Sequence, residues 1–425
     1  MPGTPFEGSI AFNPPAPGLW IGAFQLPSNT APSQILVTVP IYGDGLGPLS
    51  IFDPGPQVIV QPAGAAKLAS PQAVVVDGNG ALYIADAGAD RVIKVAGSFR
   101  SILRLGTLKL ESPSAVAVDG VGNLDIADTG NNRIVQFTID GEAHVVPLDG
   151  RTLASPRGLV VNRTGDLLIA DTGHDKIVEV KANGVVSIVS TGILKLSRPN
   201  GLAVDAAGDL FIADTGNNRI VKIDSTGAAT VLHTGLPALS GPIGIAIDPA
   251  GTLYIAETSN DELIELLPGG VQRELPAGGL SNPHGIALDH GGVLYVADTR
   301  NKRVIELLRN GTPTLTFANT VEGKVSSGGS QEVVVRNIGN AVLTISSVSY
   351  PADFPEDASG NSTDCKAGET LAHAASCTLT VDFKPIAPIK KGSSTLLKES
   401  IQINSNSLNN SRSAQTVAVE GTELK

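Results

Sequence analysis

Apolar residues recur in short runs within a unit that is repeated six times between Pro71 and Leu308. In the copy that starts at Pro199, GLAVD and LFIAD are nearly continuous apolar runs, whereas RIVKI alternates apolar with charged residues. Continuous runs of this length are typical of strands covered on both faces. A fourth run, ATVLHT, predicts one more strand near the outer rim. Each unit therefore predicts a four-stranded sheet.

Turn residues separate these runs. DAAGD predicts a type I turn followed by Gly208 at positive φ. In DTGNN, Asp214 can accept backbone N–H bonds, and Gly216 or Asn217 can take the left-handed conformation. The six copies begin at Pro71, Pro113, Pro156, Pro199, Pro242 and Pro283, with a period of 41 to 43 residues. Short strands and Gly-rich turns at such a period are typical of propeller blades.

The rim strands of the first five units follow their repeats, but the sixth copy ends at Leu308 and runs directly into a new pattern. The short run QVIVQP, residues 57–62, precedes the first copy and fits the vacant place. An N-terminal strand that completes the last blade removes the exposed edge of an open ring. The sequence thus predicts a propeller over residues 57–308 that is closed by residues 57–62.

The pattern P-x-G-[IVL]-[AV]-[VI]-D, followed by G-x-L-[YF]-[IV]-A-D-T-G-N-N-R-[IV], resembles the NHL repeat family over about 240 residues. The resemblance implies an all-β fold with a six-bladed β-propeller. It implies little about chemistry, because one fold hosts many functions.

The flanking segments lack the repeat. Residues 313–425 contain five or more alternating runs and predict a β-sandwich. Residues 1–50 share a Phe-x-Pro start and a closing strand with the end of the chain. They predict the remnant of a partial immunoglobulin-like sandwich, whose earlier strands are missing, or alternatively an extended arm. Residues 51–56 are interpreted as a linker.

The C-terminal runs VVVRNIGNAVLTISSV, CTLTVDFKP and VAVEGT resemble the immunoglobulin-like ASH class of bacterial surface proteins, also described as choice-of-anchor D type. Spacing alone leaves Cys365 and Cys377 equally open to a disulfide and to two reduced thiols. The resemblance implies that they are bonded, because a cysteine pair brackets a loop in those domains. It also implies a bacterial, extracytoplasmic protein, secreted or at the cell surface, although a signal peptide is absent from this sequence.

The net charge and the hydropathy of the chain limit the classes of partner that are expected. The net charge of −11 argues against nucleic acid, which is bound by neutralising phosphates. No run of 18 apolar residues is present, so no membrane span is predicted.

The residue after each repeat proline starts an innermost strand and should face the mouth of the central channel. These six mouth residues are Gln72, Ser114, Arg157, Asn200, Ile243 and His284. The polar ones are candidates for binding an anionic or sugar-like ligand, with a solvated rim as the alternative. Propeller lyases similar to NHL proteins bind zinc through histidines at this position, but only His284 matches here. Neither a metal site nor a cofactor is therefore predicted.

An acid ends the second strand of every unit, and a base follows five positions later in five of them. Six equivalent acids are interpreted as structural residues that cap their turns and pair with these bases. The expected partners are Arg91, Arg133, Lys176, Arg219 and Arg303. The fifth unit has Glu257 and Glu262 instead, which either bind a cation or, as favoured here, relax the turn.

The leading functional hypothesis is a non-catalytic binding or scaffold protein that engages a protein or glycan through the channel mouth. The alternative is a cation-dependent propeller lyase or a lactone hydrolase of the gluconolactonase type, with its site at the same mouth. A purely architectural spacer is a third possibility.

Overall fold

The computed structural model describes residues 16–27, 35–53, 55–60, 67–232, 238–357, 363–386, 393–408 and 414–424. The described chain is all-β apart from short 3₁₀ turns, and its repeats form four-stranded antiparallel sheets, as predicted. These turns are η1 (Ala87–Ala89), η2 (Thr129–Asn131), η3 (Thr172–His174) and η4 (Thr215–Asn217).

Each repeat contributes its strands from the channel outward. Blades 1 to 3 contain β5 (Pro71–Val76), β6 (Leu82–Asp86), β7 (Arg91–Ala96), β8 (Phe99–Ile102), β9 (Ala115–Val118), β10 (Leu124–Asp128), β11 (Arg133–Phe137), β12 (Ala143–Val145), β13 (Pro156–Val161), β14 (Leu167–Asp171), β15 (Lys176–Val180) and β16 (Val186–Ile188). Blades 4 to 6 contain β17 (Pro199–Val204), β18 (Leu210–Asp214), β19 (Arg219–Ile223), β20 (Ala229–Leu232), β21 (Pro242–Ile247), β22 (Leu253–Glu257), β23 (Glu262–Leu266), β24 (Gln272–Leu275), β25 (Pro283–Leu288), β26 (Leu294–Asp298) and β27 (Arg303–Leu307).

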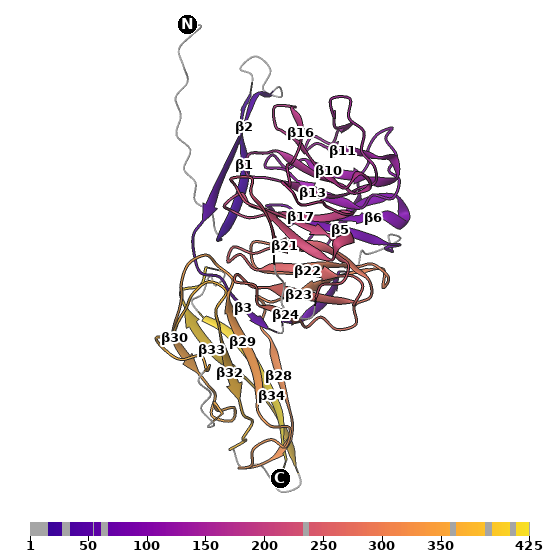
Figure 1. The fold of residues 1–425 in the computed structure, drawn as a ribbon. Helices are drawn as coiled ribbons and strands as arrows, with labels where there is room; N and C mark the ends of the chain where they lie inside the picture. Colours follow the sequence, from indigo (N-terminus) through magenta and orange to yellow (C-terminus); the bar gives the residue numbers. More distant parts are fainter. Residues whose placement is uncertain are drawn as a thin grey trace.

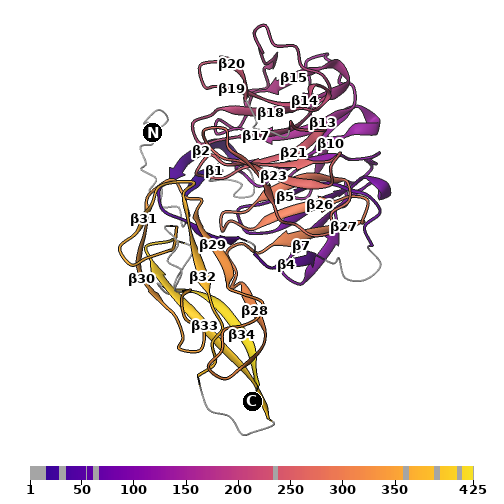
Figure 2. The ribbon, with the colours of Figure 1, turned by 60° about the horizontal axis from the view of Figure 1, so that its bottom comes forward.

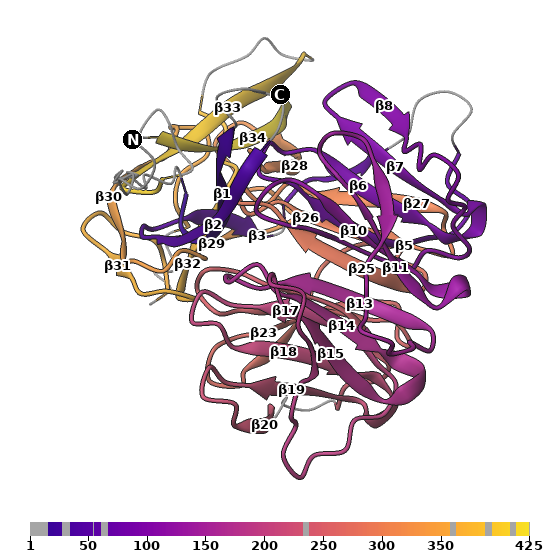
Figure 3. The same ribbon diagram turned by 90° about the horizontal axis from the view of Figure 1, so that it is seen from above.

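The six sheets close into a ring. Each innermost strand contacts the innermost strand of the next blade. The ring closes where β25 of blade 6 contacts β5 of blade 1, and these two strands are labelled next to each other in Figure 3. The outer place in blade 6 is taken by β4 (Gln57–Val60), which pairs antiparallel with β27 (Figure 2). The second strand of a blade is its most buried element, and in β18 all five residues are buried. Apolar strands of this kind fill the spaces between neighbouring blades.

A hydroxyl joins neighbouring blades at five of the six junctions. The threonine after each second-strand acid donates its Oγ1 hydrogen to the carbonyl of the next blade's repeat proline, as Thr172 does to Pro199 at 2.6 Å and Thr299 does to Pro71 at 2.6 Å. The other three donors are Thr129, Thr215 and Thr258. At the junction of blades 1 and 2 the residue is Ala87, which has no hydroxyl. This junction therefore lacks a bond that the rest of the ring has.

Replacing Thr299 with alanine is expected to lower the free energy of unfolding by about 1 kcal/mol, because a buried hydrogen bond is lost. Replacing Ala87 with threonine should raise it by up to about 1 kcal/mol. Urea denaturation would measure both changes. Thr152→Ala, at an exposed loop residue, is the control and should leave the midpoint unchanged. An equal loss in Thr152→Ala and Thr299→Ala would contradict the proposed contribution.

The C-terminal unit consists of two sheets that enclose one apolar core. The larger sheet has the order β28-β34-β33-β30-β31, and the smaller has the order β3-β29-β32. Their strands are β3 (Ser50–Asp53), β28 (Thr314–Val321), β29 (Gln331–Asn337), β30 (Leu343–Ser349), β31 (Thr370–Leu371), β32 (Ser376–Val381), β33 (Ser394–Ser405) and β34 (Ala414–Leu424). Alternate residues of β34 are buried, as expected for a strand with one face on a core. The immunoglobulin-like assignment of this unit remains a prediction.

The interpretation of residues 51–56 as a linker is wrong for residues 51–53. Strand β3 precedes the propeller in sequence but pairs antiparallel with β29 of the C-terminal unit (Figure 1). Burial explains this position, because Phe52 lies in the core of that unit and Ile51 packs against Ile338. The N-terminal segment therefore adds one strand to the C-terminal unit and the next strand, β4, to the propeller.

Before β3, the strands β1 (Gly18–Pro27) and β2 (Ile35–Gly45) form a separate two-stranded antiparallel sheet (Figure 1). The interpretation of residues 1–50 as a sandwich remnant or as an extended arm stays a prediction. We propose that the propeller comprises residues 57–308 and that the C-terminal unit comprises residues 313–425 together with β3.

A buried ionic network joins these two units. Arg309, 1% exposed, donates from Nε to Asp53 Oδ1 at 2.9 Å and from Nη2 to Glu265 Oε1 at 2.6 Å. Arg336 of β29 donates to Asp53 Oδ2 at 3.2 Å. Asp53 and Arg336 belong to the C-terminal unit, whereas Glu265 belongs to blade 5. The ring of Tyr254 lies 5.0 Å from the guanidinium carbon of Arg309.

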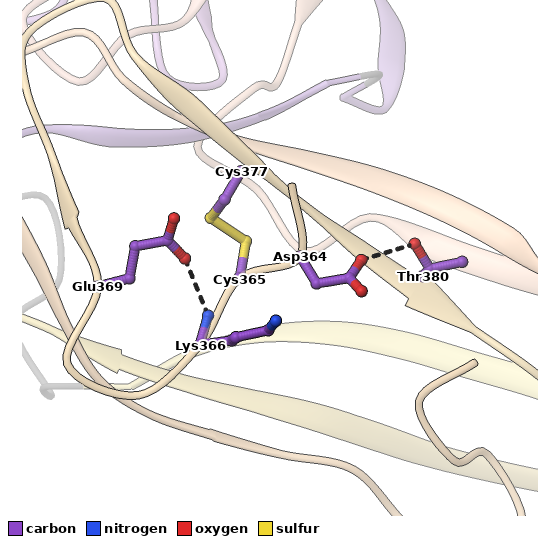
Figure 4. The surroundings of a disulfide bond; sticks show 6 residues. All are labelled: Asp364, Cys365, Lys366, Glu369, Cys377 and Thr380. Carbon is purple, nitrogen blue, oxygen red and sulfur yellow. Dashed lines mark hydrogen bonds between the residues drawn. A yellow bond between two sulfur atoms is a disulfide. The ribbon is translucent and has the colours of Figure 1, made fainter. Parts of the chain in front are cut away.

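The structure contains a disulfide between Cys365 and Cys377 (Figure 4). Both cysteines are buried in the core of the C-terminal unit. Beside them, Thr380 Oγ1 donates to Asp364 Oδ1 at 3.2 Å, and the backbone N–H of Lys366 donates to Glu369 Oε2 at 3.0 Å. The bond therefore fixes the loop between residues 365 and 377 to the edge of β32.

Candidate functional site

The glycine of the P-x-G motif brings the innermost strands together at the channel mouth. A Cβ added to Gly158 would lie 1.8 Å from the carbonyl oxygen of Asn200, and one added to Gly201 would lie 2.2 Å from that of Ile243. Any larger residue would push adjacent blades apart. The main chain of four mouth residues consequently abuts the previous blade, namely that of Asn200, Ile243, His284 and Gln72.

The structure brings five of the six mouth residues to one small cavity of about 80 Å³ on the ring axis. These residues are Gln72, Ser114, Arg157, Asn200 and Ile243. His284 does not line this cavity. Burial of the imidazole, and to a smaller extent the positive charge of Arg157, lower the pKa of His284 to about 4. His284 is therefore neutral near pH 7.

Most polar mouth residues already have partners within the propeller. Ser114 Oγ donates to the carbonyl of Pro156 at 3.2 Å, and Asn200 Nδ2 donates to Thr215 Oγ1 at 3.2 Å. Gln72 Nε2 donates to Ser70 Oγ at 3.3 Å, while His284 Nε2 lies 3.1 Å from Asn282 Oδ1. These contacts hold the four side chains in place.

Arg157 differs from the other mouth residues. Its side chain is exposed, and no hydrogen bond or ion pair joins it to any residue within the described ranges. An unpaired guanidinium at a concave surface can bind a carboxylate with two parallel hydrogen bonds. The mouth is therefore chemically suited to an acidic group, and its small volume admits one such group rather than a whole ligand.

The recurring acids are structural, but not in the way that the sequence suggested. Their turns have no side-chain cap: Asp214 instead accepts the backbone N–H of Ser197, 17 residues earlier. The left-handed position also differs from Gly216 or Asn217, because it is Asn218, with φ 52°. The acid therefore fastens the loop before its own blade.

The predicted pairing of the acids with bases holds in four blades. The Nε–H groups of Arg91, Arg133, Arg219 and Arg303 donate to Asp86, Asp128, Asp214 and Asp298. In blade 3 the predicted partner, Lys176, is wrong: His174 Nδ1 lies 2.8 Å from Asp171 Oδ2. His174 occupies the position where other blades have an asparagine that contacts the same oxygen, such as Asn217. Sequence alignment of the repeats could have revealed this substitution.

A larger cavity, of about 460 Å³, was not predicted. It lies where blades 4 to 6 meet the N-terminal hairpin and the C-terminal unit, and its wall includes Asp205, Asp248, Asp289, His290 and His373. Burial raises the pKa of Asp248 to about 7 and also raises that of Asp289. The indole ring of Trp20 stacks on His290 with centroids 3.8 Å apart.

The sequence placed His290 and His373 at unrelated positions, and their common cavity depends on how the units pack. No repeat pattern could have indicated it. Within the described residues, no group of three histidine, cysteine, aspartate or glutamate side chains is arranged to hold a metal ion.

The closed ring of four-stranded blades defines this chain as a β-propeller protein. More particularly, the chain contains NHL repeats, because the NHL repeat family model matches residues 196–223 and 280–306. A search of curated proteins found no match.

Solved propeller structures are similar to this chain. Virginiamycin B lyase from Staphylococcus aureus is 16% identical, covers 60% of this chain and 98% of its own, and has a TM-score of 0.47. A gluconolactonase from Xanthomonas campestris is 19% identical over 62% of this chain and 97% of its own, with a TM-score of 0.48. An auxiliary nutrient binding protein from Bacteroides ovatus is 15% identical over 66% of this chain and 82% of its own, with a TM-score of 0.47. At these identities the likeness concerns the fold alone.

Proposed function

We propose that this protein is a non-catalytic binding or scaffold protein that engages an acidic group of a protein or glycan at the channel mouth. The observation that carries the proposal is the exposed, unpaired Arg157 at the edge of the axial cavity. Asn200, Gln72 and Ser114 are held around the same cavity and supply additional polar groups. His284, which is neutral near pH 7, adds no positive charge to that of Arg157.

The disulfide supports an extracytoplasmic location, since such bonds persist in oxidising compartments. No helix in the described part of the chain has the length and apolar composition needed to cross a membrane. The bacterial, immunoglobulin-like character of the C-terminal unit is part of the proposal. A surface-attached or secreted protein would present the mouth to solutes and neighbouring macromolecules.

Charge reversal at Arg157 tests the proposed function. Polygalacturonate and poly-glutamate would serve as acidic probes, with neutral dextran as the reference, and surface plasmon resonance would measure binding. Arg157→Glu should weaken binding of an acidic probe by about tenfold or more, because attraction at the mouth becomes repulsion. The two acidic probes separate a glycan partner from a protein partner.

Arg104→Glu is the matched control, because Arg104 is an exposed residue after the rim strand β8 and the change in net charge is the same. This variant should bind like the parent. Equal weakening in both variants would indicate long-range electrostatics and contradict a site at the mouth. Binding to neither acidic probe, or equal binding to dextran, would also contradict it.

The enzymatic alternative makes a different prediction at the same mouth. A cation-dependent lyase or lactone hydrolase would require a stoichiometric metal whose retention depends on a mouth residue such as His284. Elemental analysis of the purified protein and of His284→Gln would distinguish the two functions.

A further inference from the structure

Blade 5 departs from the ion-pair arrangement of the other blades. In four blades the buried second-strand acid faces an arginine, which also donates from Nη2 to a backbone carbonyl 24 residues earlier. These carbonyls belong to Lys67, Lys109, Lys195 and Gly279, at distances of 2.7 to 2.9 Å. The guanidinium thus neutralises a buried carboxylate and holds a loop at the same time.

In blade 5 the position of these arginines is occupied by Glu262. Glu257, 1% exposed, lies directly opposite Glu262 on the adjacent strands β22 and β23 (Figure 1). Glu257 Oε1 accepts the backbone N–H of Ser240, as the other acids accept theirs. Its second oxygen, Oε2, is buried and has no hydrogen-bond partner in the described part of the chain. A buried carboxylate oxygen without a partner is costly, and like charges directly opposite each other repel.

The surroundings increase this repulsion. Burial raises the pKa of Glu262, and the negative charges of Glu274 and Glu257 raise it further. The chain position that corresponds to the four carbonyls is Ala238, 24 residues before Glu262. Two carboxylates therefore stand where the other blades pair a carboxylate with a guanidinium.

We propose that a hard divalent cation of the calcium class binds between Glu257 and Glu262 and replaces the missing guanidinium. Calcium accepts carboxylate, carbonyl and water oxygens in a flexible geometry. Because the site is built on one pair of opposed acidic side chains, it should be weak, with a dissociation constant on the order of 10⁻⁴ to 10⁻³ M, as in extracellular modules. This site lies between the second and third strands of blade 5, away from the axial cavity of the proposed function.

The test uses the full chain after treatment with a chelator. Calcium chloride is titrated at constant ionic strength while thermal unfolding and heat of binding are recorded, with sodium chloride as the reference. Calcium should raise the unfolding temperature saturably, and sodium should not. Glu262→Gln should abolish the response. Glu111→Gln, an exposed acid in a loop at the mouth face, should retain it.

Glu262→Arg is the decisive variant, because it restores the pair found in the other blades. It should unfold at a higher temperature than the calcium-free parent and show no response to calcium. Three results would overturn the proposal: no response of the parent at millimolar calcium, an equal response to sodium, or an undiminished response in Glu262→Arg. The last two would assign the stabilisation to general screening or to another site.

Discussion

Replacing Arg309 with methionine is expected to lower the free energy of unfolding by about 3 to 5 kcal/mol near neutral pH. The arginine is fully buried and bonds both Asp53 and Glu265, so its removal breaks two buried ion pairs and leaves these acids with Arg273 and Arg336 as partners. Breaking a buried pair from one side is far more damaging than losing an exposed pair. Guanidinium chloride denaturation, followed by circular dichroism and by tryptophan fluorescence, would measure the loss.

Lys398→Met provides the control for Arg309→Met. It breaks an ion pair with Glu420 in which the lysine side chain is 65% exposed. Exposed pairs contribute little, so the expected change is within about 0.5 kcal/mol. A comparable loss in both variants would contradict the importance of burial. In the double variant Arg309→Met, Glu265→Met the two losses should not add, because the two side chains are direct partners.

The contacts within this ionic network could not be predicted from the sequence. The repeat fixes the strands and the acid–arginine pairs, because each position recurs and its role can be read from several copies. By contrast, Asp53, Arg309 and Arg336 lie outside the repeat or at its end, so no equivalent position in another copy indicates their role. Their contact depends on β3 joining the C-terminal unit, and the sequence offers only the short apolar run LSIF as a signal.

The candidate site could likewise be predicted from the sequence only in part. The position after each repeat proline predicts the mouth residues, and the structure places five of them around the axial cavity. That Arg157 is the unpaired member is a property of the surrounding side chains, which spacing does not reveal. The larger cavity combines His290 of the propeller with His373 of the C-terminal unit, and only the packing of the units brings them together.

Differences between repeats identify another unusual position, at the second residue of the second strand in blade 2. Asp125 is 2% exposed, whereas the corresponding residues in blades 3, 4 and 5 are Leu168, Phe211 and Tyr254. Gln136 Nε2 donates to Asp125 Oδ1 at 2.9 Å. Burial raises the pKa of Asp125 to about 7, and the nearby charge of Asp119 raises it further, while the bond from Gln136 opposes the shift. The folded protein therefore holds a proton here more tightly than the unfolded chain.

Asp125 should make the protein less stable as the pH rises from about 4 to about 7. Below this range both states are protonated, and above it the folded state must bury a charge. One pKa unit corresponds to about 1.4 kcal/mol, so the shift sets an upper limit of about 4 kcal/mol on the loss. Asp125→Asn keeps the acceptor for Gln136 and carries no charge. It should match the parent near pH 4 and exceed its free energy of unfolding above pH 7.

Urea denaturation of the parent and of Asp125→Asn across this pH range would measure the difference. Asp119→Asn is the control, because Asp119 is more exposed and accepts backbone N–H bonds in its turn. It should remove only the smaller contribution that Asp119 makes to the shift. A constant difference between the parent and Asp125→Asn at every pH would show that Asp125 does not titrate in this range. Contacts other than the bond from Gln136 would then stabilise the charged carboxylate of Asp125 at this position, which is otherwise apolar or aromatic in the repeat.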